Sequence, residues 1–350
     1  MKISVILPIY NSFKSIASAI HSVDTKHDVE IICVNDGSTD QSIQLLHQLA
    51  KNDARLKIFS TEHRGISAAR NYGLSQMTGD MFMFLRPEDR FFEGQIDKMV
   101  EIMEADQDVD IVIGQVGRQE ATREWEFIDE HDVIRKNDVV TLSTCKDIMQ
   151  SMGPGAKLYR AHLASAKFDE DISFTDDHGF TIRTYVKARK IRLYDQMVYG
   201  SNIRLCSNIT TEQAKLFDIY MKDIMRSRQR IMTLLGERNL CEYYSYRLDD
   251  MIVGHIIDVR LKYDPMITLE ILDRIIEYIQ EMQAFSYSAD ALYHIIDITE
   301  NESMDWTKSN YEKWHSALMN VGIKRKSWFN FKASQFPKRH LSWFKRFVKI

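Results

Sequence analysis

The chain has 350 residues, 44% of them hydrophobic and 27% charged, with a formal net charge of −4. This balance is typical of a globular protein with one large or two medium domains and excludes the disordered and fibrous classes. The four cysteines are widely spaced without a C-x-x-C pair. This spacing argues against a disulfide framework or zinc site and suits a reducing cytoplasm.

Neither a secretory leader nor a membrane-spanning helix is expected. The apolar run at residues 3–10 lacks a small-residue cleavage site and is interpreted as a strand. No apolar run in the sequence approaches the length of about 18 residues that a spanning helix needs.

Strands and helices alternate in the first third of the chain. The pattern predicts strands at residues 3–7, 30–34, 57–59, 81–85 and 109–113, and helices at 12–23, 39–51, 66–77 and 91–105. Pro8 is expected to stop the first strand. Strands separated by helices predict right-handed crossovers and a mostly parallel α/β sheet.

The pattern is less regular between residues 114 and 208 and becomes helical beyond 210. Helices are predicted at residues 211–235, 242–261, 267–282 and 289–298, where glycine and proline are scarce. The sequence therefore predicts a helical appendage after the sheet, with a boundary near Asn208.

The fourth predicted strand ends in a charged tip. The apolar run 81–85 leads directly into Arg86, Pro87, Glu88 and Asp89. Ligands of open α/β sheets bind beyond the carboxyl ends of the strands, so this tip is a candidate site. Two carboxylates there could hold a divalent cation, although the arginine beside them would oppose one.

Two further strand ends carry polar residues suited to a nucleotide. Asp36, followed by Gly37 and Ser38, ends the second strand and could accept from a base N–H or a ribose hydroxyl, or simply form an Asx-turn into the next helix. Arg70 and Asn71 follow a run of small residues, where they could contact a diphosphate and sugar or form surface ion pairs.

Four segments together carry a family resemblance. They are residues 4–11 (SVILPIYN), 34–40 (VNDGSTD), 65–71 (GISAARN) and 79–85 (GDMFMFL). In this order and spacing the chain resembles the family 2 glycosyltransferases, nucleotide-sugar enzymes with the GT-A fold. The resemblance is good over about the first 115 residues and weaker to about residue 210. It implies a nucleotide-sugar-binding half at 1–115 and an acceptor-binding, catalytic half at 116–210, ahead of a helical domain at 211–322 and a tail at 323–350.

The resemblance also implies roles for individual residues. Pro8 and Tyr10 would line the nucleobase pocket, Asp36 would bind the base (usually uracil) with Ser38 nearby, and Arg70 would lie close to the nucleotide. The nucleotide-sugar-binding set as a whole is Pro8, Tyr10, Asp36, Ser38, Arg70, Asn71 and Arg86. The family's Asp-x-Asp-Asp motif falls on the strand-four tip. There Arg86 replaces the first aspartate, Glu88 the second, and Asp89 is kept, which leaves Glu88 and Asp89 as ligands for Mn²⁺ or Mg²⁺.

The second half resembles the family at two places. Residues 153–160 (GPGAKLYR) match one strand, and residues 168–178 match the segment that carries the catalytic base. By position the base is Asp177, with Asp176 in place of the usual glutamate. A carboxylate suits this role because an attacking hydroxyl must lose its proton. His178 is an outside candidate for the base, and Arg204 a candidate cation near the acceptor or diphosphate. Two acids favoured by a helix N-terminus would give the same pattern.

Two functions are compatible with the altered tip. The first is an inverting hexosyl- or N-acetylhexosaminyltransferase. The resemblance implies a UDP-linked donor and a glycan, lipid-linked or cell-envelope polymer as acceptor. Arg86 would then contact phosphate and replace part of the charge of the metal. The second is a non-catalytic GT-A subunit that binds a nucleotide, a glycan or a partner glycosyltransferase. We favour the enzyme because Asp36, Arg70 and Asp177 are all retained.

The tail at residues 323–350 differs from the rest of the chain. It holds nine lysines and arginines, no acidic residue, and seven phenylalanines and tryptophans. This composition suits an anionic membrane surface, and equally a helix that packs on the acidic body or on another subunit. The acidic remainder argues against nucleic acid. The expected location is the cytoplasm, with peripheral attachment at the inner face of the membrane as an option.

Overall fold

The computed structural model describes residues 1–119, 125–127, 135–202, 214–324, 327 and 329–331. The chain divides into two compact units. The first comprises Met1–Cys206 and Arg226–Leu235, and the second Ser207–Met225 and Gly236–Ile350. No helix in the described residues is both long and apolar enough to cross a bilayer. The candidate cation Arg204 and most of the tail at residues 323–350 lie outside the described residues.

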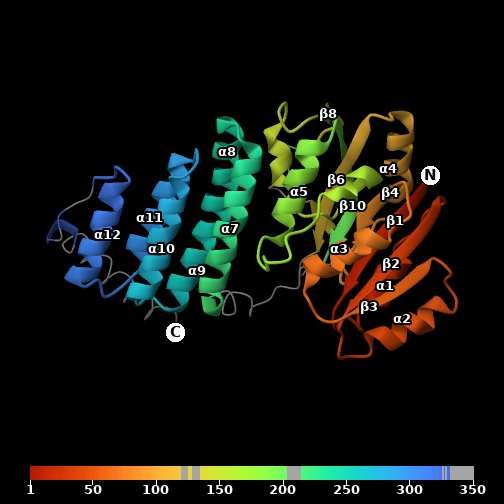
Figure 1. The fold of residues 1–350 in the computed structure, drawn as a ribbon, viewed down its shortest axis with the longest axis horizontal. Coiled ribbons are helices and arrows are strands. Elements are labelled where there is room, and N and C mark those ends of the chain that lie inside the picture. The colour runs from red at the N-terminus through yellow and green to blue at the C-terminus, as the bar shows by residue number, and fades with distance from the viewer. Residues whose placement is uncertain (120–124, 128–134, 203–213, 325–326, 328, 332–350) are drawn as a thin grey trace. The chain divides into compact units, whose positions relative to one another are not determined.

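A mixed sheet forms the centre of the first unit (Figure 1). Its strands follow the order β3-β2-β1-β4-β9-β6-β10-β5, with β7 beside β6 and β8 beside β10. Their bounds are β1 Lys2–Ile9, β2 Asp28–Asp36, β3 Leu56–Thr61, β4 Met81–Phe84, β5 Arg90–Phe91, β6 Val109–Gln119, β7 Trp125–Phe127, β8 Val139–Val140, β9 Lys157–Arg160 and β10 Lys190–Ser201. The β3-β2-β1-β4 half is parallel, as predicted, and so is the β6–β10 pair. Strand β9 lies antiparallel between β4 and β6, which the sequence did not indicate.

Pro8 does not stop the first strand, contrary to the prediction. Strand β1 continues to Ile9, and Pro8 stands opposite Val34 of β2. On its other side β1 pairs with β4 only from Ile3 to Ile6. The missing N–H of Pro8 is tolerated because β1 has lost one of its neighbours before that position.

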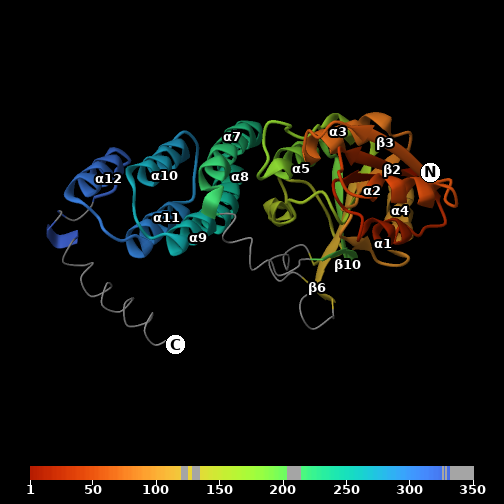
Figure 2. The same cartoon turned by 90° about the horizontal axis from the view of Figure 1, so that it is seen from below.

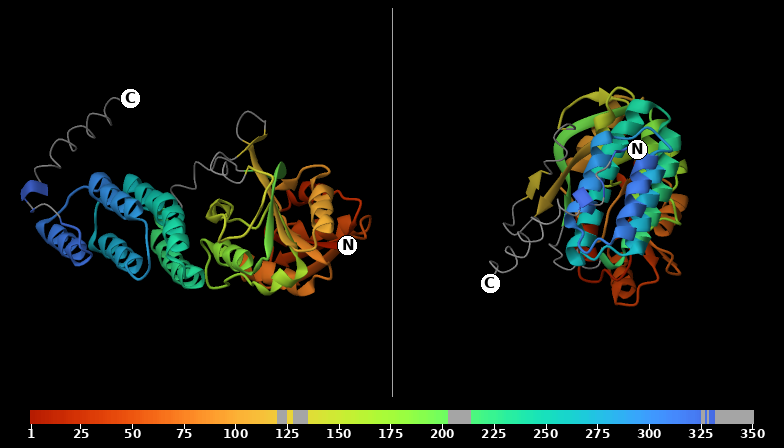
Figure 3. Two further views of the ribbon diagram at one scale, coloured as in Figure 1. Left: turned by 90° about the horizontal axis from the view of Figure 1, so that it is seen from above. Right: turned by 90° about the vertical axis from the view of Figure 1, so that its left-hand side faces the viewer.

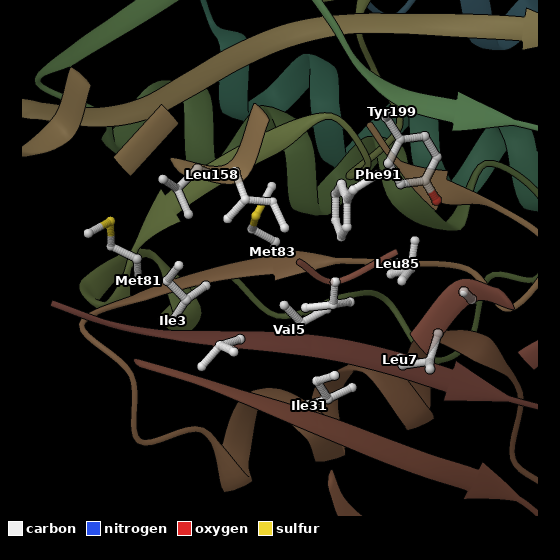
Figure 4. Close-up of a cluster of buried hydrophobic side chains, with 14 of the residues drawn as sticks. Ile3, Val5, Leu7, Ile31, Met81, Met83, Leu85, Phe91, Leu158 and Tyr199 are labelled. Atoms are coloured by element: carbon white, nitrogen blue, oxygen red, sulfur yellow. The ribbon is translucent and has the colours of Figure 1, made fainter. Parts of the chain in front are cut away.

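Helices cover both faces of this sheet. Their bounds are α1 Ile16–His21, α2 Ser42–Ala50, α3 Ile66–Gln76, α4 Gln95–Ala105 and α5 Asp176–Lys187. In Figure 2, α3 and α5 lie on one side of the sheet and α1 on the other. Side chains on one face of β1, such as Ile3, Val5 and Leu7, join α1, α2 and α4 in one apolar core, part of which is shown in Figure 4. Burial of both sheet faces fixes the strand ends that carry the site.

The second unit is helical, as expected. Its helices lie side by side in the views of Figures 1 and 3. They include α8 Arg238–Ser245, a π-helical segment Tyr246–Val253, α9 Gly254–Tyr263, α10 Leu269–Met282, α11 Ala289–Glu302 and α12 Lys308–Asn320. Helix α7, Phe217–Leu235, has its C-terminal half in the first unit. Helix α12 was not predicted.

Candidate functional site

Two cavities lie at the carboxyl ends of the central strands. The smaller, about 210 Å³, is lined by Pro8, Ile9, Tyr10, Ser12, Asp36, His63, Ile66, Ala69, Arg86, Pro87 and Glu88. The larger, about 310 Å³, is lined by Arg70, Phe84, Leu85, Arg86, Asp89, Val116, residues 150–155, Asp177, His178, Tyr199 and Ser201. Arg86 borders both. The structure therefore brings most of the predicted site residues to the two cavities, and each cavity has its own chemistry.

Asp36 forms the polar end of the smaller cavity. It is buried, and its carboxylate accepts from the backbone N–H groups of Arg64 and Gly65, each at 2.9 Å. The Nδ1 of His63 lies 2.9 Å from the same carboxylate. The loop after β2 turns at Gly37, whose φ of +69° and close approach to the backbone of His63 require glycine. These contacts fix the direction of the carboxylate at the strand end.

The aromatic wall of the smaller cavity is a stacked pair of rings. Tyr10 is 47% exposed, and its ring lies over that of His63 at 4.2 Å between centroids and 20° between planes. Pro8 lines the same cavity. A flat apolar wall beside a fixed carboxylate suits a heterocyclic base, since stacking and one directional hydrogen bond together orient it. The role of His63 was missed in the sequence, where its stacking on Tyr10 gave no signal.

Ser38 and Asn71 were predicted to bind the nucleotide sugar but line neither cavity. The Ser38 hydroxyl accepts from the backbone N–H of Asn11, so it holds the loop after β1 rather than capping a helix. The Asn71 amide donates to the Phe168 carbonyl at 3.0 Å and accepts from the Phe168 N–H at 2.8 Å. Both residues fasten loops at the edge of the site.

Arg86 lies at the tip of β4, between the two cavities. Its guanidinium is 2.5 Å from the Glu88 carboxylate, and both side chains are substantially exposed, at 55% and 39%. Although desolvation acts to lower it, the carboxylates of Glu88 and Asp89 keep the pKa of Arg86 above its ordinary value. An exposed, permanently cationic fork at this position is suited to a phosphate group.

Asp89 is buried beside this arginine. It accepts from the Tyr199 hydroxyl at 2.8 Å and from the Asn202 N–H at 3.0 Å. Burial raises the pKa of Asp89 above that of an ordinary aspartate. Tyr199 also accepts from the Arg86 N–H at 3.1 Å, so a buried tyrosine on β10 holds the tip in place. The sequence gave only a strand-like signal at Tyr199.

The tip does not by itself fit a divalent cation. Glu88 is paired with Arg86, and each Asp89 oxygen already accepts a hydrogen bond. No group of three or more His, Cys, Asp or Glu side chains in the described part of the chain is arranged to bind a metal. A hard cation prefers six or more oxygen ligands, so most of them would have to come from elsewhere. The predicted ligand roles of Glu88 and Asp89 stay predictions.

Arg70 and Asp176 form an ion pair beneath the larger cavity. Arg70 Nη1 is 2.6 Å from Asp176 Oδ2, and the two side chains are 6% and 18% exposed. The guanidinium also lies over the Phe168 ring at 4.9 Å. Its buried Nε has no hydrogen-bond partner among the residues that the structure describes. Arg70 is thus fixed by α5 while it lines the cavity, and its expected place close to the nucleotide stays a prediction.

Asp177 lines the larger cavity, whereas Asp176 does not. Both belong to the first turn of α5. Burial raises the pKa of Asp177, and the Arg70 charge opposes that rise; burial and the charge of Asp177 likewise raise the pKa of Asp176. His178 borders the cavity as well but is largely buried. Of the two acids, Asp177 therefore has the position and the basicity to take a proton from a molecule in the cavity.

Comparison with known proteins finds a match to one family model and several similar chains. Residues 4–166 match the model of Glycosyl transferase family 2. TagX of Staphylococcus aureus (strain COL), a glycosyltransferase candidate by name, is 28% identical over 99% of this chain and 100% of its own length. EpsJ of Bacillus subtilis (strain 168), called an uncharacterized glycosyltransferase, is 29% identical over 56% of this chain and 60% of its own length.

Among solved structures, the chain resembles S. aureus TarS 1–349 in complex with UDP-GlcNAc. The TM-score is 0.59 at 19% identity, over 90% of this chain and 92% of that one. This likeness confirms the predicted GT-A fold with its helical C-terminal region. The match of residues 4–166 to glycosyltransferase family 2 agrees with the four sequence motifs, and this match and the relatives support a glycosyltransferase enzyme. Enzymes of this family commonly use a divalent cation.

Proposed function

We propose that the protein is an inverting glycosyltransferase that moves a sugar from a UDP-linked donor to a glycan, lipid-linked or cell-envelope polymer acceptor. One observation carries the proposal: of two adjacent carboxylates, Asp176 is held by buried Arg70 while Asp177 lines the larger cavity. Arg86 borders the same cavity. A base and a cation at one cavity are what a transfer from a nucleoside diphosphate requires.

The two cavities would hold different parts of the donor. The smaller one, with Tyr10, Pro8 and Asp36, would hold the base, and Arg86 at the border would hold the diphosphate. The sugar would then enter the larger cavity. TarS was solved with UDP-GlcNAc, and this donor is the first to test.

The proposed reaction is a single displacement. The acceptor oxygen attacks the anomeric carbon opposite the bond to phosphate, and its proton passes to the Asp177 carboxylate. The bond between the anomeric carbon and the phosphate oxygen breaks, and its electron pair leaves on UDP. Arg86 stabilises the charge that grows on the diphosphate, by a bidentate contact that its guanidinium geometry favours. Asp176 keeps Arg70 in place and takes no proton in this scheme.

A donor panel tests the proposal. The purified chain is heated with UDP-GlcNAc, UDP-glucose, UDP, GDP-mannose or ADP-glucose, with and without Mn²⁺, and release of nucleoside diphosphate is followed in parallel. UDP compounds should raise the melting temperature, because a ligand that binds only the folded state stabilises it. Preference for a purine nucleotide would contradict the assigned donor. Absence of sugar transfer and hydrolysis with every donor, with a copurifying partner enzyme, would favour the non-catalytic accessory subunit.

The basic tail at residues 323–350 would bring the enzyme to an anionic membrane surface. Each lysine or arginine near such a surface contributes about 1 kcal/mol, and salt screens it. The full chain should sediment with phosphatidylglycerol vesicles at low salt, and a chain ending at residue 322 should not. Equal sedimentation of the two chains would leave the tail with a packing role.

A further inference from the structure

One wall of the larger cavity is a loop whose successive backbone carbonyls are held by side-chain hydrogen bonds. It consists of residues 150–155, between a short 3-10 helix at Lys146–Gln150 and strand β9. Each backbone carbonyl from residue 151 to 154 accepts from a buried or largely buried side chain. The donors are Tyr185 to Ser151 at 2.6 Å, Thr181 to Met152, Lys157 to Gly153, and Tyr159 to Pro154 at 3.5 Å. The wall is therefore held from behind by β9 and α5.

Lys157 is the charged member of these anchors. It is 1% exposed, and its Nζ donates to the Ser151 hydroxyl at 2.8 Å as well as to the Gly153 carbonyl. The ring of Tyr185 lies 6.0 Å from the same nitrogen. A buried lysine is expensive to keep because its charge loses hydration, so a purely structural anchor would be better served by a neutral group. The charge that Lys157 carries when protonated therefore acts in a poorly screened environment.

Asp177 is the group on which that charge acts. A side-chain carbon built on Gly153 would lie 3.8 Å from Asp177 Oδ2, so the carboxylate borders the residue whose carbonyl Lys157 holds. The two charges interact across this loop: Lys157 lowers the pKa of Asp177, and Asp177 raises that of Lys157. Burial outweighs the latter effect and lowers the pKa of Lys157 to about 7. Lys157 is therefore charged below neutral pH, which is the range in which Asp177 takes up its proton.

We propose that Lys157 is a positioning residue for sugar transfer, which fixes the wall at residues 151–155 and holds Asp177 in its ionised form. The inference rests on the proposed function of Asp177 as the base. The lysine touches neither cavity itself. It acts on Asp177 through the position of the Gly153 peptide and through the electrostatic field of its ammonium group.

Other charged groups set the background of this effect. Besides Lys157, the charged groups that act on Asp177 are Arg70 on α3, Arg86 at the tip of β4 and Asp176 on α5, and His178 acts on Asp176. Lys157 has Asp177 as its charged neighbour, and Tyr159 and Tyr185 beside it stay protonated because burial raises the pKa of each. Removing Lys157 leaves Arg70 and Arg86 to oppose the burial of Asp177. The base should then take up its proton at a higher pH.

Lys157→Met tests the inference, because methionine fills the site without the charge. With UDP-GlcNAc or the best donor of the panel, we expect kcat to fall about tenfold and the acid limb of kcat/KM to move up by about half a pH unit. The KM for the donor should stay within about twofold, since the smaller cavity is untouched. Ser151→Ala is the matched control: it removes one contact of Nζ and keeps the charge, so the acid limb should not move.

A second measurement needs no change at residue 157. In protein labelled with ¹⁵N-lysine, NMR titration should give Lys157 a pKa near 7, and Asp177→Asn should lower it further, because the stabilising anion is gone. An ordinary lysine pKa, or one unchanged in Asp177→Asn, overturns the inference, as does a Lys157→Met enzyme with the wild-type acid limb. A wild-type chain that transfers no sugar refutes the proposed function instead, and the NMR result then decides on the charge pair alone.

Discussion

Two pairs of adjacent acidic residues each contribute one residue to the larger cavity, beside an arginine that also lines it, and the two pairs are built in opposite ways. On α5, Asp176 is locked to Arg70, whose side chain is 6% exposed, and the next residue, Asp177, lines the cavity. At the tip of β4, Glu88 pairs with Arg86, whose side chain is 55% exposed, and the next residue, Asp89, is buried under Tyr199. In the first pair the carboxylate is available to a ligand, and in the second pair the arginine is.

This difference assigns opposite electrostatic roles to the two sides of the cavity. Arg70 is fixed in an ion pair with Asp176 on α5, so Asp177 remains available to accept a proton. An exposed arginine at the β4 tip can exchange its carboxylate partner for a phosphate, because surface ion pairs contribute little and are readily broken. In the proposed reaction, one side would then serve the acceptor and the other the leaving group. The mutations that follow probe each side in turn.

Asp177→Asn should have the largest effect. Loss of the general base should lower kcat by about 10³-fold. UDP binding should not change, because the smaller cavity proposed for the uracil ring does not include Asp177. Sugar transfer is measured by chromatography and UDP binding by calorimetry. Loss of both would show that the variant disturbs the fold or that Asp177 binds the donor. Retained transfer would move the role of base to another residue, with His178 the first to examine.

The pH dependence of the wild-type enzyme tests the same assignment. Burial raises the pKa of Asp177, so this carboxylate should take up its proton at a higher pH than an ordinary aspartate, which titrates at about pH 4. The acid limb of kcat/KM should therefore lie above pH 4 and fall toward low pH with a slope of one. The free energy of unfolding should change in the opposite direction to kcat/KM over this pH range. The folded state binds the proton of Asp177 more tightly than the unfolded state, so the free energy of unfolding should decline as the pH rises. A limb near pH 4 would contradict a buried base.

Arg86→Gln should come next. It removes the exposed charge that we assign to the diphosphate, so kcat/KM should fall about 10²-fold, the scale of losing one preorganised group at a developing charge. Wild-type transfer should retain most of its rate in EDTA, and the variant should need added Mn²⁺ for its residual rate. Complete loss of wild-type activity in EDTA, restored by Mn²⁺, would show that the metal, rather than Arg86, carries this charge.

Asp176→Asn should act chiefly on stability. It leaves buried Arg70 without its anion, and we expect the free energy of unfolding to fall by about 2 kcal/mol, less than for a fully buried pair because Asp176 is partly exposed. The rate should fall about tenfold through displacement of Asp177. Urea unfolding and transfer assays measure both. Asp171→Asn is the control: its pair with Arg230 is exposed on both sides, so unfolding should change by less than about 1 kcal/mol.

The sequence predicted the parallel half of the sheet and the two sides of the site for a physical reason. Buried parallel strands are continuous apolar runs, and the polar residues that end them meet at one edge, which placed Asp36 and Arg86 together. The resemblance indicated a strand at β9, but the sequence could predict neither its antiparallel place between β4 and β6 nor the position of Tyr199, because an antiparallel insertion leaves no period in a short segment. Nor could it tell Asn71 from Arg70: both follow the same small residues, and only the fold directs one to the cavity and the other to the Phe168 backbone.

Glu88→Gln should have the smallest effect. It best distinguishes the two hypotheses for the β4 tip, in which either Arg86 binds the diphosphate or Glu88 binds a metal ion. If Arg86 serves the diphosphate, removing its carboxylate partner releases the guanidinium, and UDP should bind about threefold more tightly, the scale of a surface ion pair. If Glu88 instead ligates a metal, the amide is a poorer ligand, and UDP should bind more weakly in Mn²⁺ while binding in EDTA stays the same. Calorimetry with UDP in the two buffers separates these outcomes. Tighter binding in EDTA would mean that an arginine has taken over at the tip of β4 the charge that a metal supplies elsewhere in the family.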